Sequence, residues 1–188
     1  MSRDFRKNPT GEFAWVPEFV QDLEKQFNFK SVPINIRQAK HASGVTIATS
    51  VFGPKQINIR VPLFSDHRER PISRREVTSW ILVHELAHVA RTEKVVKQQA
   101  YPFMPTEHYE IGGHDDKFYD YFWQMAKFAK INLEHALDQE AGYKVRSSIK
   151  MAKVHGIPGA YKKAREHKER LARRRAIKKA LGGFRFDA

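Results

Sequence analysis

The hydrophobic and polar positions of the chain predict an amphipathic helix, then short strands, then a series of longer helices. Residues 15–29 predict the first helix, and Pro17 suits its first turn because the N–H that proline lacks would have no intrahelical partner. We expect a flexible N-terminus before it, over residues 1–14. The apolar positions recur at the spacing of a helix with one buried face: Val16, Val20, Leu23 and Phe27.

Three short β-rich stretches follow, at residues 32–39, 44–52 and 55–64, with turn-prone sequences between them. In the third stretch apolar and polar residues alternate, as in a strand with one buried face. The alternating apolar residues are Ile57, Ile59 and Val61. The connections are too short to hold crossover helices, so we predict a small, mostly antiparallel three-stranded sheet.

A strongly apolar run at residues 72–93 predicts the next helix, and Ser73 and Glu76 form a capping box at its start. A loop of about twenty residues, 94–113, leads to another predicted helix at 114–131. The buried face of that helix is expected to contain Phe118, Phe122, Met125 and Ala129.

Towards the C-terminus, one more helix is predicted from about residue 132 to residue 154, and HGIPG at 155–159 then breaks the chain. We therefore predict an α+β domain over residues 15–154, a linker at 155–159 and a basic helical tail at 160–188. No stretch approaches the run of about 20 apolar residues that spans a bilayer, and the start lacks an apolar secretory signal. We expect a soluble, cytoplasmic protein without a membrane partner.

Residues 84–88 read HELAH, well inside a predicted helix. Residues four apart on a helix differ by about 40° and about 6 Å in rise, so His84 and His88 project from one face and can share a metal ion. Glu85 is rotated away and can serve as a base on a metal-activated water. The alternative is an ordinary pair of helix histidines, so a third ligand decides between the two.

Catalytic zinc usually has three protein ligands and one open position. The chain has no cysteine, so the third ligand must be His, Asp or Glu. We expect His114, which follows two glycines and opens the helix at 114–131. Glu107 and Glu110 lie 19 and 22 residues beyond His88 and remain alternatives.

Other polar residues near these ligands have open roles. His108 and Tyr109 can polarise a scissile carbonyl or simply cover the site. Asp115 and Asp116 can orient ligand imidazoles, although the helix dipole alone favours acids in a first turn. The remaining histidines have no ligand spacing and are expected to be solvated: His41, His67, His135, His155 and His167.

HELAH followed by GHDDKFYDYFW resembles the SprT-like and WLM zinc metallopeptidases, whose pattern is HExxH, then a helix-opening histidine with a bulky aromatic residue four positions later. The matching positions are His84, Glu85, His88, His114 and Phe118. The resemblance covers roughly residues 34–131. It implies a zincin-like fold, one catalytic Zn²⁺ ion and peptide-bond hydrolysis, with an extended substrate paired along the strand at 56–62. SprT-like proteins commonly have glycine directly after the third histidine. This chain has Asp115 at that position, which is closer to the WLM pattern.

The charge is concentrated in the tail. The chain has 34 lysines and arginines against 21 acids, a net charge of +13, and residues 160–188 hold +8 of it. This density can contact several phosphates, so we expect non-specific nucleic-acid binding, without stacking because few aromatics interleave. The expected contacts are Lys162, Lys163, Arg165, Lys168, Arg170, Arg173, Arg174, Arg175, Lys178 and Lys179.

These features predict a zinc-dependent metallopeptidase in which His84, His88 and His114 hold Zn²⁺ and Glu85 moves the proton from water to the leaving amine. Its protein or peptide substrates are expected to include nucleic-acid-associated proteins. The alternative is a non-enzymatic nucleic-acid-binding protein with a structural or vestigial metal site. Glu85 favours the enzyme, because a purely structural site has no need of that carboxylate.

Overall fold

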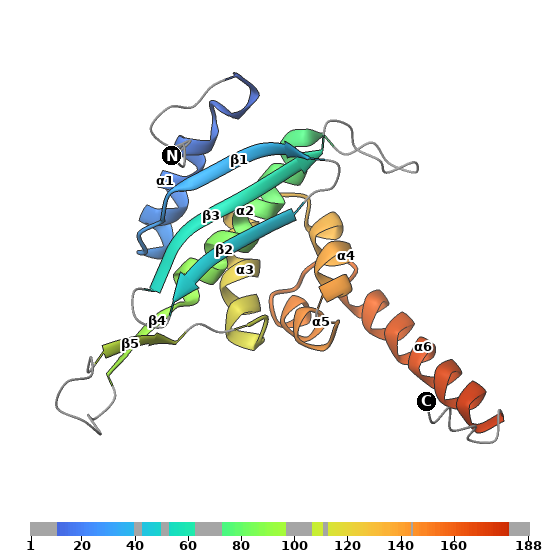
Figure 1. Ribbon diagram of the computed structural model, residues 1–188. Helices are drawn as coiled ribbons and strands as arrows, with labels where there is room; N and C mark the ends of the chain where they lie inside the picture. The colour runs from blue at the N-terminus through green and yellow to red at the C-terminus, as the bar shows by residue number, and fades with distance from the viewer. Residues whose placement is uncertain are drawn as a thin grey trace, which may run out of the picture.

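The protein has an α+β fold in which helices gather behind one face of a small sheet and the C-terminal helix projects from the body (Figure 1). The structure, a computed structural model, describes residues 11–39, 43–49, 53–62, 73–96, 107–110, 113–143 and 145–180. Its buried apolar residues form one core between the sheet and the helices.

The sheet contains β1 (Ile34–Ala39), β2 (Ser43–Thr49) and β3 (Gly53–Pro62), in the order β1-β3-β2. β2 and β3 are antiparallel, but β1 pairs with β3 in parallel, with Ile34 opposite Ile57. The prediction of a mostly antiparallel sheet is therefore wrong, because the sheet is mixed. The parallel pair needs no crossover helix, since the chain runs back through β2, which takes the outer position.

The central strand is β3, and its predicted alternation is confirmed. Ile57, Ile59 and Val61 are fully buried, while Arg60 between them is exposed. Because β1 and β2 pair with its two sides, β3 has no free edge, and the expectation that a substrate pairs along residues 56–62 is wrong. Among the described strands of this sheet, β2 pairs only with β3 and so keeps one free edge.

The HELAH residues lie in α2 (Arg74–Arg91), which begins with the predicted capping box. The Glu76 N–H donates to Ser73 Oγ at 3.2 Å, and the Ser73 N–H donates to the Glu76 carboxylate at 2.9 Å. α2 packs against β2 and β3 on one side and against α3 (Asp116–Phe128) on another. Every residue from 77 to 87 is therefore buried.

The predicted buried faces of α1 (Val16–Phe27) and α3 are largely confirmed, except that Phe27 and Ala129 are only partly buried against the core. In α1 the buried residues are Val16, Val20 and Leu23. In α3 they are Phe118, Tyr119, Phe122, Trp123, Met125 and Ala126. Asp115 caps α3, since its side chain accepts the backbone N–H of Phe118 at 2.9 Å.

The segment predicted as a loop, residues 94–113, contains two strands. β4 (Glu93–Val96) and β5 (Glu107–Glu110) form a separate antiparallel pair. Neither strand is long enough to give a clear two-residue alternation, and a four-residue strand is stabilised mainly by its partner. The sequence pattern therefore missed both.

The helix predicted over residues 132–154 is in fact two helices, α4 (Leu133–Tyr143) and α5 (Val145–Val154), which pack against each other. Gly142 lies in the last turn of α4, and glycine lowers helix propensity because it loses more backbone entropy than other residues on folding. Both helices have helical periodicity, so the periodicity alone does not reveal where the first one ends.

The basic segment forms α6 (Ala160–Ala180), whose first turn packs on the body while the rest projects outward (Figure 1). Ile157 and Ala160 are buried in the core, so the segment predicted as a linker is anchored at its end. The domain boundaries stay a prediction, and residues 1–10 and 181–188 lie outside the described part of the chain. None of the described helices combines the length and the apolar character that crossing a membrane requires.

Candidate metal centre

Three histidines from two elements meet at one point. His84 and His88 project from the same face of α2, and His114 lies just before Asp115, the N-cap of α3. The Nε2 atoms of His84 and His114 are 2.8 Å apart, and one ring nitrogen from each of the three histidines lies within 4.8 Å of the others. The three therefore form a cluster that can hold a metal ion, as the spacing predicted.

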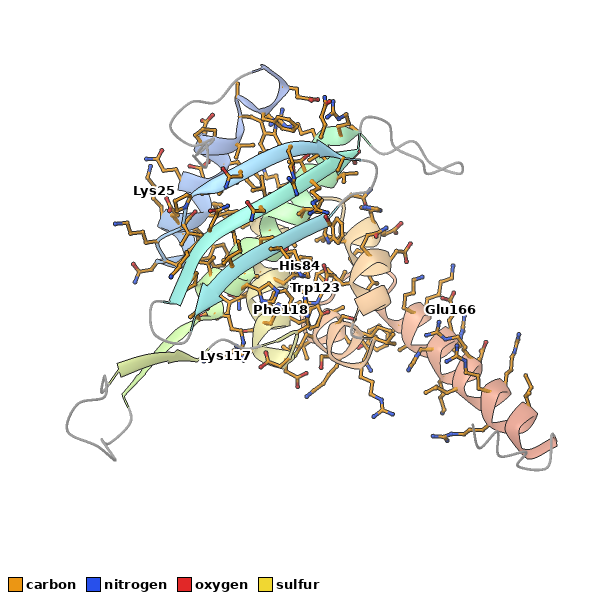
Figure 2. The ribbon with its side chains drawn as sticks, in the orientation of Figure 1. Lys25, His84, Lys117, Phe118, Trp123 and Glu166 are labelled. Carbon is orange, nitrogen blue, oxygen red and sulfur yellow. The ribbon has the colours of Figure 1, made fainter. Side chains whose placement is uncertain are left out.

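The cluster is largely shielded from solvent. His84 is buried and His88 and His114 are partly buried. The Phe118 ring centroid is 5.0 Å from that of His84 and 4.3 Å from that of His88. Figure 2 shows His84 and Phe118 together behind the β2 side of the sheet. Phe118, four residues after His114, therefore packs the imidazoles in place.

The electrostatics of the cluster favour neutral imidazole at His88. Burial, together with the neighbouring His84, His114 and Arg91, lowers the pKa of His88 to about 3. Neutral imidazole is the form that binds metal ions, so this ligand needs no proton removed near pH 7. Positive charges on neighbouring imidazoles would repel one another, which also favours the neutral form of His88.

A buried carboxylate from α4 contacts the far side of His84. Glu140 is fully buried, and its Oε1 lies 2.7 Å from Nδ1 of His84. The same oxygen accepts the indole N–H of Trp80 at 2.9 Å. Burial alone would lower the pKa of His84, but the charge and hydrogen bond of Glu140, with a contribution from Glu85, raise it. Nδ1 is thus engaged with Glu140, and Nε2 faces the other histidines.

The position of His114 is fixed through its neighbour Asp115. The guanidinium of Arg91, one turn beyond His88 on α2, donates to both carboxylate oxygens of Asp115, from Nε to Oδ1 at 3.2 Å and from Nη2 to Oδ2. Burial opposes ionisation, but these bonds and the Phe118 N–H hold the pKa of Asp115 below its usual value. This pair joins the end of α2 to the start of α3.

Glu85 lies on the other side of the cluster, against β2. The Thr46 hydroxyl donates to Glu85 Oε2 at 2.6 Å and also lies 3.2 Å from the backbone oxygen of Glu85. Burial raises the pKa of the Glu85 carboxyl, and His84 and Thr46 offset part of that effect. A Cβ added to Gly44 would lie 2.4 Å from Glu85 Oε1, so only glycine leaves room for this carboxylate.

A cavity of about 280 Å³ opens beside these residues. Its lining includes all three histidines and Glu85, together with residues of β2 and the α2 residues Trp80 and Ile81. The base candidate and the metal cluster therefore face one shared space that a substrate can enter.

The structure reassigns several residues that the sequence left open. Asp116 forms an exposed ion pair with Lys150, so it does not orient a ligand. His155 is not solvated as predicted, because its side chain is 15% exposed and lies 2.7 Å from Asp120. For Glu107, His108, Tyr109 and Glu110 the structure describes only the backbone of β5, and His41 and His67 lie outside the described residues.

Sequence reasoning missed Glu140, Trp80, Thr46, Gly44 and Arg91. One of them left a signal. Glu140 shares a helical face with the buried Ala136 and Leu137, and an acid on the apolar face of a helix marks a buried carboxylate that needs a partner.

The ten basic residues predicted to contact phosphates all lie on α6. Seven of the eight with described side chains are exposed, and the eighth, Lys163, is half-buried and pairs with Asp138 at 2.6 Å. The side chains of Lys178 and Lys179 lie outside the described residues. The exposed charges point around the whole circumference of the helix rather than along one stripe.

Comparisons with known proteins add no relative. No family model, no curated protein and no solved structure matches this chain significantly. The functional argument therefore depends on the site itself.

The donor set can hold a metal ion. Three imidazoles converge, one of them bonds the Glu140 carboxylate through its other nitrogen, and a further carboxylate, Glu85, is held by the Thr46 hydroxyl and lines the same cavity. Three nitrogen ligands with an open side are the pattern of a catalytic zinc site, and the carboxylate behind a ligand histidine is its usual support.

Proposed function

We propose that the protein is a zinc-dependent peptidase of zincin-like fold, in which His84, His88 and His114 bind the ion and Glu85 is the general base. The observation that supports this best is the common cavity: the three histidines and the buried carboxylate of Glu85, which is not one of the proposed ligands, face the same open space. A structural metal site is closed and has no open position for water or substrate.

Bound zinc would supply Lewis acidity, which acidifies a water molecule and polarises a substrate carbonyl. Glu85 would take the proton of the attacking water on a carboxylate oxygen and deliver it to the leaving amine. Its raised pKa suits this work, because a base that also serves as an acid is most effective when its pKa approaches the working pH. Thr46 holds Oε2 and so orients the carboxylate towards the cavity.

The free edge of β2 is the best candidate for binding an extended peptide. β2 lines the cavity through Gly44, Val45, Thr46 and Ala48. Unpaired N–H and C=O groups on a strand edge can add a peptide as a further strand. A substrate bound in this way would run past Glu85, which the Thr46 hydroxyl ties to β2.

The test of this proposal is Glu85→Gln. It removes the base and leaves the three histidines untouched, so the zinc content should stay at the wild-type level. Hydrolysis of an unfolded protein substrate should fall by about 10²- to 10⁴-fold. Glu18→Gln, an exposed glutamate on α1, is the control and should leave the rate unchanged. Peptidase activity that survives in Glu85→Gln would remove Glu85 from the mechanism.

Nucleic-acid binding by α6 is a second candidate function, alone or together with the first. It is favoured by the exposure of seven basic side chains on a helix that projects from the body (Figure 1). Charges spread around a helix can contact phosphates but are poorly placed to read base edges, so the binding would be non-specific. Together with the peptidase site, it would bring the enzyme to proteins bound on nucleic acid.

Neutralising charge tests this better than truncation, because the first turn of α6 belongs to the core. Replacing Arg173, Arg174 and Arg175 together by glutamine should weaken duplex binding. The slope of log affinity against log salt should become shallower by up to about 3, since each phosphate contact contributes about 0.9. The control removes three exposed charges elsewhere: Lys25, Lys127 and Lys130. Equal losses in both variants would show that α6 has no special role.

A further inference from the structure

Glu140 is a buried carboxylate that the proposed chemistry does not use. It comes from α4, beyond residues 34–131, the segment that resembles the metallopeptidases. Its side chain is fully buried. One oxygen, Oε1, makes both of its hydrogen bonds: it accepts from Trp80 Nε1 at 2.9 Å and pairs with His84 Nδ1 at 2.7 Å.

We propose that Glu140 is a positioning residue of the metal centre: it fixes the ring of His84 and keeps a proton on Nδ1, so that Nε2 is the atom that binds the metal ion. This inference rests on the proposal that the three histidines hold a metal. It makes α4 part of the centre, although none of the predicted ligands lies on that helix.

The geometry of the three side chains supports this role. Trp80 and His84 lie one turn apart on α2, so their N–H groups present a single site to Oε1 of Glu140. A carboxylate oxygen only accepts, so Nδ1 is the donor and Nε2 carries the lone pair that can bind a metal ion. Nε2 of His84 lies 2.8 Å from Nε2 of His114 and so points into the cluster. Trp80 therefore holds Glu140 where Glu140 selects the tautomer of His84.

The other oxygen of Glu140 argues against a purely structural role. Oε2 is buried and has no hydrogen-bond partner in the described part of the chain. A buried carboxylate with an unsatisfied oxygen destabilises a fold, and an apolar residue of similar volume often does not. A divalent cation on the opposite face of His84 would compensate this charge through the imidazole.

The experiment compares metal affinity and thermal stability in Glu140→Gln and in wild type. Glutamine keeps the shape and an oxygen that can accept from both donors, but removes the charge. Zinc affinity, measured by competition with a chelator, should fall by about 10- to 100-fold. The melting temperature of the metal-free protein should stay the same or rise, so the loss should appear only in the zinc-dependent part of the stability.

The matched control is Asp120→Asn, which alters another acid–imidazole pair, Asp120 with His155 at 2.7 Å, away from the cluster. It should lower stability slightly and leave zinc affinity unchanged. If wild type binds zinc and Glu140→Gln binds it equally tightly, or if both variants lose affinity alike, the positioning role is wrong. If wild type binds no zinc, the proposed function fails with it.

A measurement on the wild-type protein covers the case in which Glu140→Gln does not fold. In the zinc-loaded chain, nitrogen NMR of the His84 side chain should show a proton on Nδ1 that exchanges slowly with water, because it is buried against Glu140. A bare Nδ1, with the proton on Nε2, would overturn the proposal. A rapidly exchanging Nδ1 proton would overturn it as well.

Discussion

On the cavity side of the three histidines the buried carboxylate is Glu85, and on the sealed side, towards α4, it is Glu140. Glu85 is held by the Thr46 hydroxyl and faces open space. Glu140 is held by Trp80 and His84 and is fully enclosed. The two carboxylates belong to different helices and have different surroundings. Under the proposed function, we therefore expect Glu85 to control turnover and Glu140 to control metal affinity.

The largest effect is expected on the cavity side, from Gly44→Ala. The new Cβ would lie 2.4 Å from Glu85 Oε1 and 2.7 Å from Ile81 Cγ2, so Glu85 must move away from Thr46. Peptidase turnover should fall about 100-fold, comparable with the loss of a positioned base, while zinc affinity stays within a few-fold of wild type. Steady-state kinetics at saturating zinc measure turnover, and a chelator titration measures zinc affinity.

Gly142→Ala is the control for that substitution. A Cβ there meets nothing within 4 Å, and the residue is exposed at the end of α4. Turnover should be unchanged, and the free energy of unfolding should rise by up to about 1 kcal/mol, because alanine loses less backbone entropy in a helix. If Gly44→Ala retains full turnover, Glu85 does not depend on its place against β2, and the division between the two sides fails.

A smaller effect, on metal affinity, is expected from Asp115→Asn. Asparagine can still cap α3, but it loses the ion pair with Arg91 that ties His114 to α2. Because Asp115 is half exposed and acts through its neighbour, zinc affinity should fall by about tenfold or less, with turnover at saturating zinc retained. Chelator competition measures the first, and kinetics measure the second.

Asp116→Asn is the matched control for Asp115→Asn, since it breaks the neighbouring exposed ion pair with Lys150. It should change neither zinc affinity nor turnover, because exposed pairs contribute little. If Asp115→Asn lowers turnover but not zinc affinity, Asp115 acts on catalysis rather than on metal binding, and the distinction between the two sides is wrong.

The part of the site that sequence predicted is the part set by short-range geometry. His84 and His88 share a helix face because they are four residues apart, and His114 was found because it opens the next helix. Glu140 is 56 residues from His84, and Thr46 is 39 residues from Glu85. Such contacts depend on how elements pack, which no local pattern encodes. An acid on the apolar face of α4 was the one available sign.

The fold shows the same limit. The alternation of Ile57, Ile59 and Val61 predicted the buried face of β3 correctly. The prediction of a mostly antiparallel sheet was wrong, because connection length alone does not tell whether β2 or β3 lies beside β1. The difference matters for function, since it moves the free edge beside the cavity from β3 to β2. The strand pattern therefore gave the burial, while the packing decided which strand can meet a substrate.

The most direct test of the central claim is the zinc content of the purified chain after removal of metal and reloading, compared with His114→Ala. The cluster predicts about one zinc ion per wild-type chain, and a loss of tight binding when the third imidazole is removed. His167→Ala, on α6 and away from the cluster, should keep the wild-type content. A wild-type chain without stoichiometric metal, or a His114→Ala variant that retains zinc fully, would contradict the account.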